Sequence, residues 1–279
     1  AINVGNDNTI VIDAKNFITT FRLLDISDLT VDGSFATGGA ICAVFVTKGI
    51  HPLIAIVAAI ISGFICGAVT GFLHTKCKMP AILAGILTQL SLYSINLRIM
   101  SGRANLPLTG FNTLFGTISQ ALNINKYYVA FVIALLFAIV IIALLYWFFG
   151  TELGSAIRAT GNSVQMVKSL GINSDTMKLL GLMIANGLVG LSGALNALYG
   201  QATDVRIGTG AIVIALASIV IGEMIIPSKK GNFAMKLAAI MVGSVIYRII
   251  YALVFQLGLN TDDFSNEVKI NLNKTVSVP

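Results

Sequence analysis

Apolar positions along this chain are gathered into long runs, and short polar segments separate these runs. A helix of about 20 apolar residues is long enough to cross the hydrocarbon core of a bilayer. Five runs come close to that length with few or no charges, namely 52–73, 79–97, 128–149, 179–199 and 237–257. Two further runs are shorter, 209–226 and 35–47. One such run also fits a buried core helix, but six or seven of them predict a membrane protein.

The pattern predicts an all-α integral membrane protein. We expect a polytopic helical bundle with about six to eight membrane segments, including short discontinuous helices. The run 128–149 is the clearest span, because aromatic residues lie at both of its ends. Aromatic side chains are enriched at both membrane interfaces. We assign the transmembrane domain to residues 21–262.

The two ends of the chain are polar and differ from this domain. Residues 1–20 lack the basic start and apolar middle of a signal peptide, and they are too polar to form a span. Residues 263–279 form a polar tail. We interpret both ends as loose or surface segments and assign them no function.

Composition supports a membrane location. Of 279 residues, 56% are hydrophobic and only 11% are Asp, Glu, Lys or Arg, whereas soluble domains carry about 25% charged residues. Soluble enzymes, disordered regulators and nucleic-acid-binding proteins therefore fit poorly. The net charge of +6 is typical of cytoplasmic loops that carry Lys and Arg.

The basic residues between the runs predict an orientation. With the loop after 52–73 in the cytoplasm, eight basic residues lie inside: Lys76, Lys78, Arg158, Lys168, Lys178, Lys229, Lys230 and Lys236. Five lie outside: Lys48, Arg98, Arg103, Lys126 and Arg206. An excess of Lys and Arg marks the cytoplasmic side.

The sequence carries no motif of a catalytic or metal site. The three cysteines form no C-x-x-C pair and the two histidines are far apart, so no metal site is predicted. A phosphate-binding G-x-x-x-x-G-K-[ST] loop is missing as well. We therefore expect a chain that is not an enzyme, holds no cofactor and binds no nucleic acid.

A polar segment, 24–35, precedes the shortest apolar run. It holds Asp28, Asp32, Gly33 and Ser34. Transporters present backbone groups to a substrate where a polar break leads into a half helix near the membrane midplane, so these residues are candidates for a translocation path. The alternative is that Asp32 or Ser34 simply caps a helix N-terminus.

A related pattern occurs later in the chain. Asp204, Gly208 and Gly210 precede the short run 209–226. Two short, glycine-interrupted segments in corresponding halves of a chain point to a transport site. We therefore add these three residues to the candidate path.

Two charged residues fall inside predicted spans, where charge is expensive and usually functional. Arg248 lies in the middle of its run, and we assign it to the path or to helix pairing, with a purely structural carbonyl partner as the alternative. Glu223 lies near the end of its run and reaches the interface. For Asn96, Asn186 and Asn196 we expect hydrogen bonds between helices.

Small residues form a stripe in one predicted span. Gly63, Gly67 and Gly71 recur every four residues and leave a bare backbone face that another helix can approach closely. Packing within one subunit is the simpler reading of this stripe. A dimer seam or a moving helix contact is the functional reading.

The predicted inner loop 150–178 mixes small, apolar and charged residues, with glycine breaks expected at Gly161 and Gly171. Its apolar residues suit short helices that lie across a membrane face. This arrangement predicts a docking surface for a cytoplasmic partner, although an ordinary amphipathic interfacial loop is the alternative.

Several long motifs resemble a known family. LDISDLTVDGSFATGGAICAV and GTELGSAIRATGNSVQMVKSLGIN look like permease subunits of bacterial importers with ATP-binding cassettes. The resemblance is to the branched-chain amino acid and monosaccharide permease superfamily. Within it, the chain is most similar to tryptophan/tyrosine-type uptake permeases, and the likeness covers about residues 21–262.

The resemblance implies partners and roles. Two permease chains would pair as a homodimer in the bacterial cell membrane, an ATPase would dock from the cytoplasm, and a substrate-binding protein would deliver ligand outside. The loop at 150–178 would then be the ATPase coupling loop. Its implied contact residues are Glu152, Gly154, Arg158, Gly161 and Asn162.

The chain departs from the family pattern at both ends. The family has an apolar helix before the position of Phe21 and another after about Asn260, where this chain is polar. We interpret the difference as the mark of a truncated or altered permease.

Two transport functions follow from these observations, and a membrane scaffold or signalling subunit is less favoured because the long loops carry no appended soluble domain. The first is a permease subunit that moves a small solute by alternating access, an amino acid and by resemblance an aromatic one. The alternative is an ion-coupled secondary transporter, in which Asp28, Asp204 and Arg248 would serve as ion or proton sites.

Overall fold

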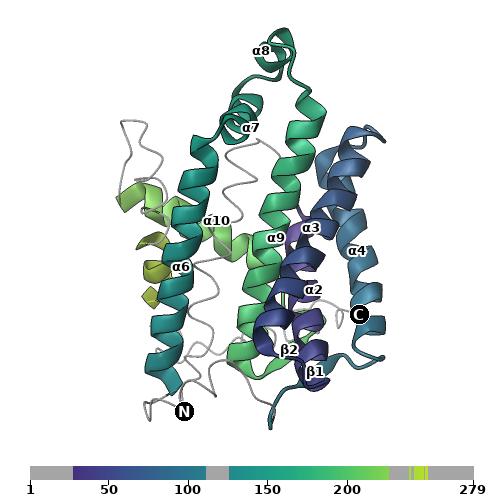
Figure 1. Cartoon of the computed structure of the whole chain (residues 1–279), viewed down its shortest axis with the longest axis vertical. Coiled ribbons are helices and arrows are strands. Elements are labelled where there is room, and N and C mark those ends of the chain that lie inside the picture. The colour runs from purple at the N-terminus through teal and green to yellow at the C-terminus, as the bar shows by residue number, and fades with distance from the viewer. Residues whose placement is uncertain (1–27, 111–125, 226–238, 240–241, 248, 251–279) are drawn as a thin grey trace, which may run out of the picture.

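A computed structural model describes residues 28–110, 126–225, 239, 242–247 and 249–250. The helices are α2 (Thr30–Thr47), α3 (Pro52–Thr75), α4 (Ala81–Ile99), α6 (Lys126–Gly150), α7 (Glu152–Asn162), α8 (Val164–Ser169), α9 (Ser174–Gly200) and α10 (Ala211–Ile225). The strands are β1 (Asn105–Pro107) and β2 (Ala202–Asp204). The predicted all-α membrane bundle is confirmed, with one short ribbon of two strands added (Figure 1).

Four of the described helices are long and apolar enough to cross a membrane, namely α2, α3, α4 and α9. The end of α6 together with α7 forms a bent pair that is a fifth candidate. Helix α10 is apolar but has only 15 residues. The described residues therefore hold fewer spans than the six to eight expected, and most of the run 237–257 lies outside them.

Helix α2 is longer than the hydrophobic pattern predicted. The run at 35–47 was expected to follow an irregular polar break, but the helix begins at Thr30. Asp32, Gly33 and Ser34 are thus residues of the first turns of α2. The prediction of a break at these three positions was wrong because hydropathy was used to place the helix start.

The start of α2 also differs from the simple capping prediction. Leu29 occupies the N-cap position and makes no side-chain capping bond, so neither Asp32 nor Ser34 is the cap. The backbone N–H of Thr30 instead donates to the carboxylate of Asp28 over 2.9 Å. An acidic group near the first turn satisfies orphan amides and complements the helix dipole.

Helices α2, α3 and α9 form the centre of the fold, and glycines let their backbones approach. A Cβ atom at Gly63 would overlap the carbonyl oxygen of Asn186, and one at Gly67 would overlap that of Leu182. A Cβ atom at Gly71 would lie 2.7 Å from the side chain of Leu179, in the first part of α9. The stripe on α3 therefore lies against α9 of the same chain.

The outer faces of the helices are apolar. On α3, Ile61 and Ile65 are 53% and 59% exposed, and on α6 Tyr146 and Trp147 are 61% and 71% exposed. Water does not favour such a surface, whereas lipid tails are as apolar as these side chains. The exposed side chains mark the surface that faces the bilayer.

The two ends of the bundle are distinct in Figure 1. Helices α7 and α8 stand at one end, and the β1–β2 ribbon lies at the other. Helix α7 turns away from the end of α6 by 81°. Short helices were expected in the loop 150–178, and α7 and α8 are these helices.

The ribbon was not predicted. Strands β1 and β2 are antiparallel, with Asn105 opposite Asp204 and Pro107 opposite Ala202. The backbone N–H of Leu108 extends the pairing by donating to the carbonyl of Gln201 over 2.7 Å. Three-residue strands leave almost no alternating pattern for a sequence to display.

Candidate functional site

Two helix N-termini meet inside the bundle. The Asp32 carboxylate in α2 accepts hydrogen bonds from the backbone N–H of Gly210 over 3.2 Å and of Ile212 over 3.3 Å, at the start of α10. Gly208 packs so closely that a Cβ atom there would overlap the carbonyl oxygen of Asp32. The structure therefore brings together residues from the two segments that the sequence analysis selected.

A second polar contact joins α2 to α9. The side-chain amide of Asn186 donates to the Asp28 carboxylate over 2.7 Å and accepts from the Ser34 hydroxyl over 2.6 Å. Asp28 is 3% exposed, and Ser34 and Asn186 are fully buried. Polar groups at such depth are stable only when they are hydrogen-bonded. We call Asp28, Ser34 and Asn186 the buried polar triad.

The triad extends to α3. The hydroxyls of Thr30 and Thr70 lie 2.7 Å apart, and both residues are buried. Asn186 itself also donates to the carbonyl of Leu182, one turn earlier in α9. Three helices are therefore linked by polar contacts at the level where α2 begins.

This level lies beside the middle of α9. Asn186 is near the middle of α9, which runs from Ser174 to Gly200 and extends through the molecule in Figure 1. Asp28 and Asp32 are held at that level by their contacts with Asn186 and Gly210. The starts of α2 and α10 are thus joined to each other and to the middle of α9.

Gly33 provides a close contact on the other side of α2. A Cβ atom there would lie 3.0 Å from the Leu92 side chain and 3.1 Å from the backbone of Gln89 in α4. A second close contact involves Gly85 in α4, where a Cβ atom would lie 2.8 Å from the backbone nitrogen of Leu29. Helix α4 therefore closes the start of α2 from the side opposite to α9.

Asp204 does not join the triad. It lies in β2, and its carboxylate accepts a hydrogen bond of 2.7 Å from the backbone N–H of Arg206. The Arg206 guanidinium lies 6.0 Å from the ring centroid of Tyr93 in α4. These three residues sit near the ribbon end of the bundle, so the structure separates Asp204 from Asp28 and Asp32.

Arg248 and Glu223 are the two charged residues that fall inside predicted spans. Arg248 lies outside the described residues, and its assignment to the path stays a prediction. Glu223 is half-buried near the end of α10.

Thr30 and Thr70 were not predicted as site residues, and for Asn186 only a hydrogen bond between helices was expected. The polar character of Asn186 inside an apolar run was the available signal. A polar residue in a span needs a partner, but its partner lies 158 positions away in the chain.

The predicted docking loop presents exposed charged and apolar side chains. Glu152, Arg158 and Asn162 of α7 are exposed. Leu153, Met166 and Leu170 are 53%, 51% and 65% exposed. Such a mixed surface at one end of a membrane bundle suits a protein partner.

The glycines of this loop have local roles. Gly154 is buried, and a Cβ atom there would overlap the carbonyl oxygen of Phe148, so it permits the sharp turn from α6 into α7. Gly161 was predicted to be a break but is helical, and α7 ends at Asn162. The break falls at Ser163, whose hydroxyl accepts from the Met166 N–H and caps α8.

The described residues hold no group of three or more His, Cys, Asp or Glu side chains that could bind a metal ion.

Comparison with known families and proteins agrees with this picture. Residues 8–272 match the family model described as branched-chain amino acid transport system / permease component. The chain is 43% identical over 245 residues to a tyrosine transport system permease protein of Clostridioides difficile (strain R20291), covering 88% of this chain and 79% of that protein.

Two further relatives are more distant. An uncharacterized protein of Rickettsia prowazekii (strain Madrid E) is 32% identical, over 86% of this chain and 83% of that protein. The ribose import permease protein of Escherichia coli (strain K12) is 26% identical, over 78% of this chain and 66% of that protein. No solved structure matches the chain.

Proposed function

This chain belongs to the family of permease components of branched-chain amino acid transport systems, and from that premise we propose that it forms the translocation path of an ATP-binding-cassette importer. It is a multi-pass membrane protein and a transport subunit without catalytic activity of its own. The family implies an ATPase and a substrate-binding protein as partners.

The observation that supports a translocation path is the meeting of the starts of α2 and α10. Helix α10 has only 15 residues, and transporters form their solute sites where such short, discontinuous helices begin. Asp28, Asp32, Gly33, Ser34, Gly208 and Gly210 surround this junction. Asp204 belongs to the ribbon, and Arg248, which lies outside the described residues, completes the proposed set.

Contacts between helices suggest how an ATPase moves this junction. Helices α7 and α8 both contact α9, and α9 carries Asn186. Asn186 holds Asp28 before α2, and Asp32 in α2 holds the start of α10. A displacement of α7 by a docked ATPase would reach the α2–α10 junction through these packed elements.

This linkage gives alternating access a structural basis. We propose that ATP binding closes the ATPases, shifts α7 and α8, and changes the side on which the path is open. Ligand and ATP act on this equilibrium only through their different affinities for the two states. Glu152, Gly154, Arg158, Gly161 and Asn162 form the proposed coupling surface.

We propose an amino acid as the solute, with an aromatic one favoured. The support is the 43% identity to a protein named as a tyrosine transport permease, against 26% to a ribose import permease. A second copy of this chain would complete the path. We place the assembly in a bacterial plasma membrane, with the binding protein at the ribbon end.

The proposed substrate can be tested by identifying the ligand of the partner binding protein. Calorimetric titration with tyrosine, tryptophan, leucine and ribose should give the lowest Kd for an aromatic amino acid. Tight ribose binding with no binding of the amino acids would replace our substrate with a sugar and leave the permease assignment intact.

A further inference from the structure

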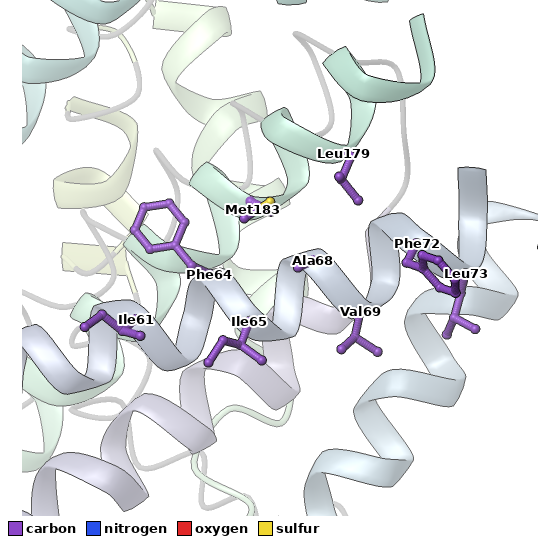
Figure 2. A pocket seen from close by; sticks show the side chains of 9 residues that line it. All are labelled: Ile61, Phe64, Ile65, Ala68, Val69, Phe72, Leu73, Leu179 and Met183. Carbon is purple, nitrogen blue, oxygen red and sulfur yellow. The ribbon is translucent and has the colours of Figure 1, made fainter. Parts of the chain in front are cut away.

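A groove of about 520 Å³ runs along the outer side of α3 (Figure 2). Nine apolar side chains line it, seven from α3 and two, Leu179 and Met183, from α9. Ile61 lies at one end and Leu73 near the other. We call this feature the α3–α9 groove.

The groove lies on the surface that faces lipid. Ile61, Ile65, Val69 and Phe72 are each about half exposed. The glycine stripe of α3 faces a different direction and packs against α9. The walls of the groove carry no hydrogen-bonding side chains. A hydrocarbon chain can therefore occupy the groove without displacing any hydrogen-bond partner.

The length of the groove matches one leaflet. Ile61 and Leu73 are twelve positions apart on α3, which at 1.5 Å per residue is about 18 Å. Half of the hydrocarbon core of a bilayer is about 15 Å. A single acyl chain from one leaflet therefore fits along the groove.

Among the described residues, positive charge gathers at the Leu73 end of the groove. Lys76 and Lys78 follow the end of α3 and are exposed, and Lys178 immediately precedes Leu179. The Cδ1 atom of Leu179 lies 2.7 Å from the position of a Cβ atom at Gly71, so α9 brings Lys178 to the level of the last turns of α3.

The balance of charge at this end favours an anion. Asp175 in the first turn of α9 is the acidic neighbour of Lys178 in the described chain, so three lysines face one carboxylate. At the far end, residues 52–61 contain no Lys, Arg, Asp or Glu. Basic groups where transmembrane helices reach the interface attract anionic lipid headgroups.

We propose that the α3–α9 groove binds an anionic phospholipid, with one acyl chain along the groove and the phosphate headgroup at Lys76, Lys78 and Lys178. The apolar walls hold the tail, and the lysines select the headgroup. This proposal concerns a lipid site and does not depend on the transported solute.

Native mass spectrometry of the purified full chain in a nonionic detergent tests the proposal. The probes are phosphatidylglycerol and phosphatidylcholine with identical palmitoyl and oleoyl chains. We expect phosphatidylglycerol to bind at least five-fold more tightly. The triple variant Lys76→Gln, Lys78→Gln and Lys178→Gln should reduce this preference to less than two-fold.

A matched triple variant removes three exposed charges at the other end of the bundle, Lys48→Gln, Arg98→Gln and Arg103→Gln. It should keep the five-fold preference. Equal binding of the two lipids by the unaltered chain would overturn the proposal, as would a preference that survives loss of the three groove lysines.

A second measurement locates the lipid without relying on the lysines. A photoreactive side chain introduced at Ile65 should cross-link to phosphatidylglycerol in nanodiscs that contain equal amounts of both lipids. Cross-linking mainly to a second copy of the chain, or to phosphatidylcholine at least as often, would contradict an anionic lipid site.

Discussion

The carboxylate of Asp28 and the side-chain amide of Asn186 lie 2.7 Å apart, although 158 positions separate them in the chain. Asn186 spans the gap between Asp28 and Ser34 and so ties the start of α2 to the middle of α9. The Asp28 carboxylate also accepts a hydrogen bond from the backbone N–H of Thr30.

Replacing Asn186 should destabilise the fold. The Asn186→Ala variant leaves an oxygen of Asp28 and the hydroxyl of Ser34 buried without their partner, and each such group costs about 1–3 kcal/mol. We expect a clear drop in the thermal unfolding midpoint in detergent. Asn162→Ala, at an exposed position of α7, is the matched control and should leave the midpoint nearly unchanged. Equal midpoints for both variants would show that the triad contributes little.

A methyl group at Gly67 should force α3 and α9 apart. The new Cβ atom would overlap the carbonyl oxygen of Leu182, and backbone cannot move aside as a flexible side chain does. Overpacking of this kind costs about 1–3 kcal/mol, so Gly67→Ala should unfold at a lower temperature. Gly200→Ala has open space around it and should be tolerated. A Gly67→Ala protein as stable as the unaltered chain would mean that the helices are not in such close contact.

Removing the carboxylate of Asp32 should loosen the start of α10. Loss of a capping side chain costs about 0.5–2 kcal/mol, and the junction proposed to line the path would lose its link. We expect Asp32→Ala to reduce solute uptake strongly, while Asp32→Asn, which keeps one acceptor oxygen, should retain part of it. Asp175→Asn, in the first turn of α9, serves as the control. Full uptake by Asp32→Ala would remove Asp32 from the proposed path.

Charge removal on α7 should uncouple transport from ATP hydrolysis. Arg158→Ala or Glu152→Ala alters the proposed ATPase surface, so uptake should fall while the ATPase loses its stimulation by liganded binding protein. Arg103→Ala changes an exposed arginine at the opposite end of the bundle and should preserve both activities. If the α7 variants keep normal uptake and stimulated hydrolysis, the docking surface lies elsewhere.

The apolar pattern predicted most helices well. The run 52–73 corresponds to α3, Pro52–Thr75, and the run 179–199 lies within α9, Ser174–Gly200. Long spans are predictable because lipid requires an uninterrupted apolar helix. The start of α2 was misplaced because Asp32 and Ser34 look unsuited to a helix until their partners on α10 and α9 are known.

The contacts of the candidate site were less predictable than its segments. Asp32 and Gly210 were both selected, but no sequence pattern pairs a carboxylate with backbone amides 178 and 180 positions away. For Asn96, the expected hydrogen bond between helices is not found. The residue is buried, and neither the nitrogen nor the oxygen of its side-chain amide has a hydrogen-bond partner in the described structure.

Uptake by proteoliposomes tests the central claim most directly. The chain, its ATPase and its binding protein would be reconstituted together, and accumulation of radiolabelled tyrosine would be measured with ATP inside or outside the vesicles. An importer subunit predicts accumulation that requires ATP on the α7–α8 side and survives ionophores. Uptake that proceeds without ATP and collapses when ionophores abolish the ion gradient would contradict the account and favour an ion-coupled transporter.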